Sequence, residues 1–303
     1  MTVEGTIDCG ESMIVLNTKT ETDEKIEISL KMYIDEISLI LNKLICIKCD
    51  VCHSVCPKEA VLVIRDEEGV RIDIDEKKCV LCEVCSHFCP VHAISIEYNN
   101  KSKSILVDNQ GLLPFPRRIS IDTGRCPSHC SKNPEGVHRW CRKEDRIIDN
   151  TYEDCPKFCF VCVESCPRDA IEVKDDSAEP DEAICLACYH CLDNCEYGAI
   201  TLTPIFSGEI SIDSSLCPED CNKCIDICPT QAIVREGKDV IVNDRHCTLC
   251  GACSNICDKE AIRLKRTEIT AQDGEFSAAW SHAVERLGIK DYAFPRRSMG
   301  TRK

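Results

Sequence analysis

The sequence predicts an α+β fold made of three tandem modules, with a small β-rich lead before them and a helical extension after them. Two observations support this prediction. Twenty-four of the 28 cysteines fall into six blocks of four, and the blocks form three pairs whose members start 33, 30 and 30 residues apart. An alanine followed by a branched aliphatic residue stands four residues after the last cysteine of every block. The length of the chain alone would suggest roughly two domains, but this repeat indicates three modules.

The six blocks share the spacing Cys-x2–3-Cys-x2-Cys-x3-Cys. In sequence order they are Cys46, Cys49, Cys52 and Cys56; Cys79, Cys82, Cys85 and Cys89; Cys155, Cys159, Cys162 and Cys166; Cys185, Cys188, Cys191 and Cys195; Cys217, Cys221, Cys224 and Cys228; and Cys247, Cys250, Cys253 and Cys257. Thiolates at this spacing can wrap a loop around three corners of a 4Fe-4S cube. The sequence therefore predicts six 4Fe-4S clusters, which would serve as the core of modules too small for a large apolar one.

The segments outside the blocks predict the remaining elements. In the lead, Ile26, Ile28 and Leu30 alternate with polar residues, and this period-two pattern continues to Ile34, which predicts a strand with one buried face. Residues 276–287 predict an amphipathic helix. The predicted boundaries are a β-rich lead over 1–42, modules over 43–98, 152–204 and 205–265, a linker with a degenerate half-repeat over 99–151, and a helix with a basic tail over 266–303.

The alanine signature predicts the local structure after each block. Its members are Ala60-Val61, Ala93-Ile94, Ala170-Ile171, Ala199-Ile200, Ala232-Ile233 and Ala261-Ile262. A helical turn after the last ligand would place the small alanine against the cluster and lead into a strand. Proline follows the last cysteine in four blocks, where it can start that turn. Glu196 and Asp258 replace it in the other two, and an acid also suits a helix N-terminus.

Charge and composition exclude several functions. The chain has 37 Lys plus Arg against 52 Asp plus Glu, a formal net charge of −15, so no nucleic-acid partner is expected. No apolar run reaches the ~18 residues of a membrane span. Metal-ligand spacing and the lack of a signal peptide after Met1 predict a reducing cytoplasm and not a secreted disulfide scaffold. No glycine-rich phosphate loop or nucleophile–base pair is evident, so no catalytic residue is predicted.

Two other metal sites fit part of the cysteine pattern. A structural zinc ion uses two pairs of ligands, which would leave the central cysteine of every triplet without a role. The triplets that begin at Cys155 and Cys217 match the spacing of radical S-adenosylmethionine enzymes, but each has a fourth cysteine and lies in a module too small for a barrel. His53, His87 and His190 lie inside blocks and are not needed as ligands.

Residues 99–151 contain part of a further block. Ser120-Ile-Asp-Thr-Gly-Arg-Cys-Pro-Ser-His-Cys130 parallels Ser211-Ile-Asp-Ser-Ser-Leu-Cys-Pro-Glu-Asp-Cys221. The third and fourth ligand positions are Asn133 and Val137, so this half-block cannot hold a cluster in the ordinary way. It is interpreted as the remnant of a lost half-module. The alternative is a seventh metal site at Cys126, Cys130 and Cys141, with His129, His138 or Cys9 as further ligands.

With these motifs, residues 43–98 and 152–264 resemble the 2x(4Fe-4S) bacterial-type ferredoxins, whose modules have the ferredoxin-like βαββαβ fold. Tandem modules around an intervening segment resemble the polyferredoxins, in particular the polyferredoxin subunit of formylmethanofuran dehydrogenase. The polyferredoxin associated with hydrogenase in methanogens is similar too, but it is longer and more uniformly repeated.

The resemblance implies crossed ligand sets, in which the last cysteine of each block binds the cluster of the other block. The first pair of blocks gives Cys46, Cys49, Cys52 with Cys89, and Cys79, Cys82, Cys85 with Cys56. The second gives Cys155, Cys159, Cys162 with Cys195, and Cys185, Cys188, Cys191 with Cys166. The third gives Cys217, Cys221, Cys224 with Cys257, and Cys247, Cys250, Cys253 with Cys228.

The resemblance also implies a function. We expect a non-catalytic electron-transfer subunit that relays single electrons through six 4Fe-4S clusters between a donor or acceptor and a redox enzyme complex, with formylmethanofuran dehydrogenase of methanogenesis as the expected complex. A polyferredoxin of a hydrogenase or heterodisulfide reductase complex is the alternative. A stand-alone iron–sulfur enzyme and a cluster-based assembly or sensor protein are further ones. The expected partners are other subunits of a multisubunit redox enzyme and a soluble ferredoxin.

Overall fold

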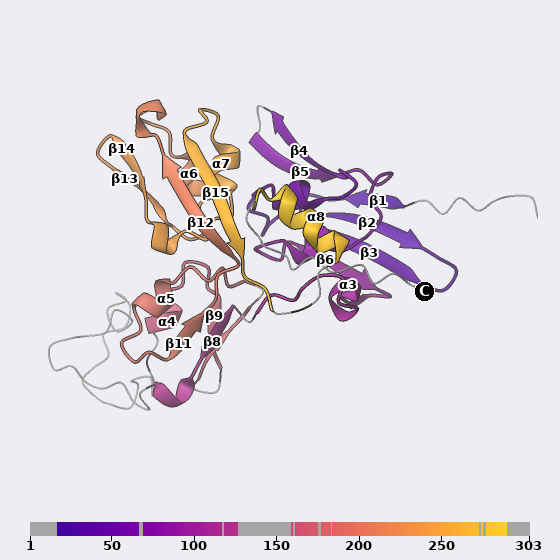
Figure 1. Cartoon of the computed structure of the whole chain (residues 1–303), viewed down its shortest axis with the longest axis horizontal. Coiled ribbons are helices and arrows are strands. Elements are labelled where there is room, and N and C mark those ends of the chain that lie inside the picture. Colours follow the sequence, from indigo (N-terminus) through magenta and orange to yellow (C-terminus); the bar gives the residue numbers. More distant parts are fainter. Residues whose placement is uncertain are drawn as a thin grey trace, which may run out of the picture.

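The computed structural model describes residues 17–66, 69–116, 118–126, 159, 161–174, 177–182, 184–272, 274 and 277–289. Within them the chain forms three lobes that meet near the centre of the molecule (Figure 1). Each lobe contains two short helices from its two cysteine blocks and at least one antiparallel strand pair. The predicted mixture of helices and strands is therefore confirmed.

The first lobe is built on a five-stranded antiparallel sheet. In spatial order its strands are β1 (Thr18–Glu21), β2 (Lys25–Lys31), β3 (Glu36–Asn42), β6 (Ile94–Tyr98) and β7 (Lys101–Ser102). The alternating pattern of the lead buries Ile26 and Ile28 completely. The strand ends at Lys31, earlier than the pattern predicts, because the Met32 N–H closes a turn with the Asp35 carbonyl oxygen at 2.7 Å.

The rest of the first lobe carries the first two cysteine blocks. Its elements are α1 (Val51–Val55), the hairpin of β4 (Val61–Asp66) and β5 (Gly69–Ile74), α2 (Val84–His87) and α3 (Ile105–Asp108). Strand β3 pairs with β6, and Leu41 lies opposite Ile94. A strand from the β-rich lead thus pairs with the strand that follows the second block.

The second and third lobes share one topology. The second contains β8 (Ile119–Ile121), the 3-10 helix η1 (Thr123–Arg125), α4 (Val161–Glu164), β9 (Ile171–Lys174), β10 (Ser177–Pro180), α5 (His190–Asp193) and β11 (Ile200–Leu202). The third contains β12 (Phe206–Ile212), η4 (Ser214–Leu216), α6 (Lys223–Ile227), β13 (Ile233–Glu236), β14 (Asp239–Val242), η5 (Asp244–His246), α7 (Ala252–Ile256) and β15 (Ile262–Ile269). In both lobes the first strand pairs with the last, and the middle two strands form a hairpin.

The six signature alanines tie the two halves of each lobe together. All six are between 1% and 3% exposed. The carbonyl oxygen of each accepts a hydrogen bond, 2.7–2.8 Å long, from the backbone N–H of an Asp or Asn in the other half of the lobe. The pairs are Asn42–Ala93, Asp75–Ala60, Asp122–Ala199, Asp181–Ala170, Asp213–Ala261 and Asn243–Ala232. The alanine is therefore required to be small and also fixes where the opposite loop begins.

The C-terminal helix α8 (Ala278–Arg286) packs on the first lobe. The Ser277 hydroxyl oxygen caps it by accepting a hydrogen bond from the Trp280 N–H at 3.1 Å. Trp280 is completely buried, with its ring centroid 5.3 Å from that of Phe88. Arg286 Nε donates to the Ser54 carbonyl oxygen at 3.1 Å. No helix in the described ranges is long and apolar enough to cross a membrane.

Candidate metal centres

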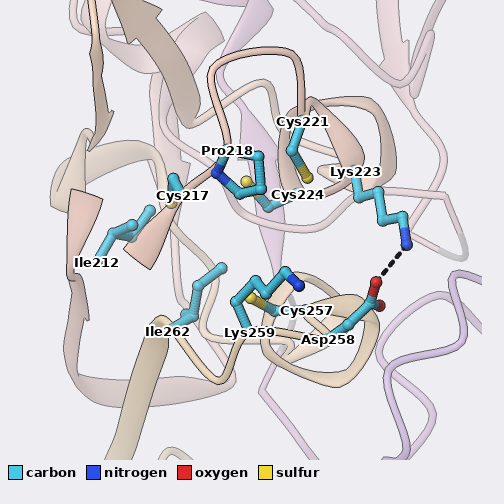
Figure 2. Close-up of a pocket in the computed structure, with 10 residues that line it drawn as sticks. All are labelled: Ile212, Cys217, Pro218, Cys221, Lys223, Cys224, Cys257, Asp258, Lys259 and Ile262. Carbon is cyan, nitrogen blue, oxygen red and sulfur yellow. Dashed lines mark hydrogen bonds and ion pairs between the residues drawn. The ribbon is translucent and has the colours of Figure 1, made fainter. Parts of the chain in front are cut away.

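A cavity of about 230 Å³ in the third lobe is lined by four cysteines from two different blocks (Figure 2). They are Cys217, Cys221, Cys224 and Cys257. Ile212 and Ile262, which are opposite each other in β12 and β15, also line it. At its edge Lys223 Nζ lies 2.6 Å from Asp258 Oδ2. These four cysteines are one of the crossed sets.

Two narrower cavities are lined by two further crossed sets. In the first lobe the cavity beside Leu39 and Ile74 is lined by Cys56, Cys79, Cys82 and Cys85. In the second lobe the cavity beside Ile119 and Leu202 is lined by Cys166, Cys185, Cys188 and Cys191. In each case a single cysteine, the last of its block, faces the first three cysteines of the other block.

Two more sets are identified by the thiols that lie close enough to interact. Burial raises the pKa of the Cys52 thiol well above its usual value, and the neighbouring thiols add to this effect. Those neighbours are Cys49, Cys85, Cys89 and Cys46. In the third lobe, burial likewise raises the pKa of Cys253, with further contributions from Cys250, Cys247 and Cys228. Cys89 and Cys228 are again the last cysteines of the opposite blocks.

The sixth predicted set, in the second lobe, is only partly described. Cys155 lies outside the described residues, as do Cys9, Cys130 and Cys141. Burial raises the pKa of the Cys162 thiol to about 11, and electrostatic interactions with the thiols of Cys159 and Cys126 add to this effect. Cys126 itself has Cys195 and Cys159 as neighbours. The structure therefore places Cys126, which the sequence assigns to a degenerate half-repeat, among the cysteines of this site.

The electrostatics of these sites suit a bound metal cofactor. Burial raises the pKa of Cys191 to about 12 and that of Cys247 to about 11. Several thiolates close together in an apolar site disfavour one another's charge. Iron would supply the positive charge that allows the thiols to deprotonate, so its binding would release protons. The residues present thus fit iron–sulfur clusters, which cysteine thiolates hold.

Backbone N–H groups point at the sulfurs of four predicted ligands. The N–H of the signature alanine donates to the Sγ of the last cysteine in four blocks, at 3.2–3.3 Å. These pairs are Ala60–Cys56, Ala93–Cys89, Ala170–Cys166 and Ala232–Cys228. Hydrogen bonds to the sulfurs help set the reduction potential of a cluster. The alanine signature therefore serves the site as well as the fold.

The ligand loops also bend through left-handed backbone at residues other than glycine. Two positions after the first cysteine, φ is +57° at Lys48, +55° at Leu81, +52° at Ala187 and +51° at Leu249. Two positions further on, Asp50, Glu83 and Tyr189 are left-handed too. Alternation of this kind turns successive N–H groups to one side and forms a nest for anionic groups. Sequence reasoning missed these positions, because left-handed backbone is usually marked by glycine or asparagine.

Among the described residues, no three His, Cys, Asp or Glu side chains are gathered as a single metal ion requires. The three histidines inside blocks have other contacts. His53 Nδ1 lies 2.6 Å from the Val61 carbonyl oxygen, and His190 Nε2 lies 2.8 Å from that of Thr230. His87 stacks on Phe115, with ring centroids 4.6 Å apart.

One cysteine set of the first lobe meets one set of the third lobe. Burial raises the pKa of the Cys49 thiol. Among the neighbouring thiols, Cys250 of the third lobe contributes most to this increase. Arg266 interacts electrostatically with both thiols and donates from Nη2 to the Cys250 carbonyl oxygen at 2.9 Å. Asn255 Nδ2 donates across the same boundary to the Lys48 carbonyl oxygen at 2.7 Å.

Arg118, which is 4% exposed, joins the first lobe to the second. Its Nη1 donates to the carbonyl oxygens of Pro90 at 2.7 Å and Cys185 at 3.1 Å. Burial lowers its pKa, while the thiols of Cys185 and Cys89 act in the opposite direction. One cation therefore lies between predicted ligands of two different sites.

The second and third lobes meet through side chains next to their ligands. Arg245 Nε donates to Asp193 Oδ2 at 2.7 Å, and His246 Nε2 lies 3.2 Å from the same oxygen. The rings of His190 and His246 stack with centroids 3.7 Å apart. We call the three sets at these junctions the inner sites: Cys46/Cys49/Cys52/Cys89, Cys166/Cys185/Cys188/Cys191 and Cys228/Cys247/Cys250/Cys253. The remaining sites, one in each lobe, are the outer sites.

Sequence comparisons match this chain to iron–sulfur proteins. Residues 45–93 match the family model of the 4Fe-4S dicluster domain. The uncharacterized ferredoxin MJ0199 of Methanocaldococcus jannaschii is 34% identical over 58 residues, which are 94% of that protein and 18% of this chain. Pyruvate synthase subunit PorD of Thermotoga maritima is 40% identical over 57 residues, 58% of its length and 18% of this chain. The putative oxidoreductase AegA of Escherichia coli is 32% identical over 88 residues, which are 27% of this chain and only 13% of AegA.

A solved structure matches nearly the whole chain. It is a chain of the formate dehydrogenase–heterodisulfide reductase–formylmethanofuran dehydrogenase complex from Methanospirillum hungatei, with a TM-score of 0.72 and 25% sequence identity. The match covers 89% of this chain and 91% of that chain. The likeness therefore extends beyond any single lobe.

Proposed function

Since the chain belongs to the 4Fe-4S ferredoxin family and is a polyferredoxin, we propose that it carries electrons within an oxidoreductase complex through six clusters held by three ferredoxin modules. When bound, the clusters would accept and pass on single electrons. The protein's own contribution is to supply the thiolates, to direct N–H groups at the sulfurs and to fix the spacing of the sites. No residue is proposed as catalytic.

The crossed grouping of the cysteines carries this proposal. Four sites group three described cysteines of one block with the last of the other, and in a fifth Cys52 interacts with Cys46, Cys49 and Cys89 as well as with Cys85 of the second block. In the sixth, Cys159, Cys162 and Cys195 take three positions. A disulfide scaffold or two-pair zinc sites would not need this crossing, whereas two clusters in one module do.

The element order of the lobes supports the assignment of βαββαβ modules. From β3 to β6, from β8 to β11 and from β12 to β15, each lobe runs strand, helix, hairpin, helix, strand. The first and last strands of each module pair with each other, and each adjoins one ligand loop. Their pairing therefore brings the two ligand loops of the module together. On this basis the first module begins at β3, inside the segment that the sequence assigns to the lead.

The proposed path is branched and not a single row. The three lobes meet near the centre of the molecule (Figure 1), and the inner sites are those whose cysteines or neighbouring side chains lie at these junctions. An electron that enters at one outer site could then reach either of the other two through the centre. A path with three outer sites as entry and exit points suits a subunit that contacts more than one redox partner.

We favour a formylmethanofuran dehydrogenase complex as the assembly. The support is the resemblance of the tandem modules to its polyferredoxin subunit, together with the likeness to a chain of a complex that contains this enzyme. The same complex contains heterodisulfide reductase, which makes a role beside that enzyme the second candidate. The proposed partners are the other subunits and a soluble ferredoxin, in the cytoplasm.

The proposal is tested by rapid mixing of the anaerobically reconstituted full chain with a reduced two-cluster ferredoxin. We expect the visible absorption of the oxidised clusters to bleach, and to return when catalytic subunits of formylmethanofuran dehydrogenase and their substrate are added. Return of the absorption with heterodisulfide reductase alone would favour the second candidate. Clusters that no ferredoxin or dithionite reduces would contradict an electron-transfer role.

A further inference from the structure

We propose that Cys126, and not Cys155, is the first ligand of the outer site in the second lobe, which it completes with Cys159, Cys162 and Cys195. This inference rests on the proposed function, because it assumes that a cluster occupies the site. It also reassigns the structural role of residues 119–126. They are the first strand and first ligand of the second module, and not the remnant of a lost one.

The strand before Cys126 occupies the position of a first module strand. β8 pairs antiparallel with β11, and Ile121 lies opposite Ile200. In the third lobe the corresponding partners are Ile212 and Ile262. Each of these last-strand isoleucines directly follows a signature alanine. Therefore β8 stands in the second lobe where β12 stands in the third.

A single hydrogen bond marks the start of every ligand loop. Each residue whose N–H reaches a signature alanine carbonyl is an Asp or Asn. In five of the six pairs this residue is four positions before the first cysteine of a block. In the sixth pair it is Asp122, which bonds Ala199 at 2.8 Å and is four positions before Cys126. By contrast, the residue four positions before Cys155 is Thr151, which does not fit the sequence rule.

The turn between this residue and the cysteine is also repeated. Asp122 Oδ1 accepts from the Gly124 N–H at 3.2 Å, and Asp213 Oδ1 accepts from the Ser215 N–H at 3.1 Å. The cysteine N–H then closes the turn at 3.1 Å in both lobes. Cys126 has φ −71° and ψ 138°, and Cys217 has φ −85° and ψ 125°. Cys126 therefore leaves η1 in nearly the direction in which Cys217 leaves η4.

The thiol of Cys126 has the same kinds of neighbours as that of Cys217. After burial, Cys195 and Cys159 contribute most to raising the pKa of Cys126. For Cys217 the cysteine neighbours are Cys257 and Cys221. Cys195 and Cys257 are the last cysteines of their blocks, and Cys159 and Cys221 are the next predicted ligands along the chain. The neighbours of Cys126 in the second lobe therefore correspond to those of Cys217 in the third.

A neighbouring side chain fixes the loop in place. Arg125 Nη1 donates to the Gly198 carbonyl oxygen at 3.0 Å, next to signature Ala199. Residues 127–158 are then an insertion in the sequence between the first and second ligands, and Cys155-x3-Cys159 repeats the spacing of Cys217-x3-Cys221.

The test compares C126S, C155S and C217S in the full chain, reconstituted anaerobically under one protocol. C217S is the matched reference, since it removes the corresponding ligand in the third lobe. We expect C126S and C217S each to lose between one and four of roughly 24 irons and to show the EPR signal of a three-iron cluster after oxidation. We expect C155S to retain the iron content and spectrum of the wild type.

Iron retained at the remaining sites shows that each variant still folds. Loss of iron in C155S with wild-type iron in C126S would overturn the inference and leave the proposed function intact. Wild-type iron in both variants would overturn it as well. Failure of the wild-type chain itself to bind iron and sulfide would instead count against the proposed function.

Discussion

Arg266 Nη2 donates a hydrogen bond to the carbonyl oxygen of Cys250 at 2.9 Å. Its Nε donates to the Leu249 carbonyl oxygen at the same distance. The guanidinium is therefore held against one inner site while it also interacts with the Cys49 thiol of another. A cation fixed between two anionic sites favours the arrival of an electron at either of them.

The first prediction concerns this charge. Arg266→Gln should lower the reduction potential of at least one inner cluster by roughly 60 mV, about tenfold in a one-electron equilibrium, because the reduced cluster loses a stabilising positive charge. The measurement is a potentiometric titration followed by EPR.

Two variants control this experiment. Arg266→Lys keeps the charge and should keep most of the potential, while Arg263→Gln removes an exposed charge from the same strand and should have little effect. Equal potentials in the wild type and Arg266→Gln would show that Arg266 has only a structural role.

The second prediction concerns Arg118, which joins the first two lobes. Arg118→Met should reduce the free energy of unfolding by roughly 2–4 kcal/mol, because the Pro90 and Cys185 carbonyl oxygens lose a charged donor in a buried site. Chemical denaturation under anaerobic conditions measures the change. Arg71→Gln is the matched control because its side chain is 55% exposed. Equal losses in the two variants would refute the assigned role.

The third prediction concerns α8. Trp280→Ala should cost roughly 3–5 kcal/mol, because the side chain is completely buried among the rings of Phe88 and Phe115. Limited proteolysis should then cut between the third lobe and α8 more readily. Leu216→Ala, at a side chain that is 49% exposed, should change stability little. Unchanged stability of Trp280→Ala would mean that α8 does not pack on this lobe.

The fourth prediction concerns pH. Burial raises the pKa of Cys162, Cys188 and Cys247 to about 11, and iron binds only deprotonated thiols. Cluster assembly on the apoprotein should therefore release protons and become more favourable from about pH 7 to about pH 8.5. Iron content after reconstitution at each pH, with proton release followed in parallel, measures this. A yield that is flat or falls with rising pH would be inconsistent with buried neutral thiols in the apoprotein.

Local sequence patterns predict most of the cysteine groups that the structure brings together. The spacing of Cys217, Cys221 and Cys224 predicts one loop around one cofactor, and the resemblance to ferredoxins supplied Cys257 as the fourth ligand. The alanine signature predicted a buried small residue, although not that its N–H and carbonyl would both be used. These features depend on neighbours within a few residues or on a repeat that occurs six times.

The missed features depend on contacts between distant residues. The sequence assigned Cys126 to a degenerate half-block because Asn133 and Val137 stand at its third and fourth ligand positions, while Cys155 has the expected spacing to Cys159. The Asp122–Ala199 hydrogen bond supports the proposed alignment, which an Asp or Asn four positions before the first ligand could have suggested from the sequence. The meeting of Arg118 with Cys185 spans 67 residues and leaves no local pattern.

Quantitation of iron and acid-labile sulfide in the anaerobically reconstituted full chain tests the central claim most directly. Six crossed cysteine sites predict roughly 24 iron and 24 sulfide atoms per chain. About 28 of each would mean that a seventh cluster uses cysteines outside these sites. A plateau near 16 or below, in protein whose thermal unfolding is cooperative, would contradict a polyferredoxin with six clusters.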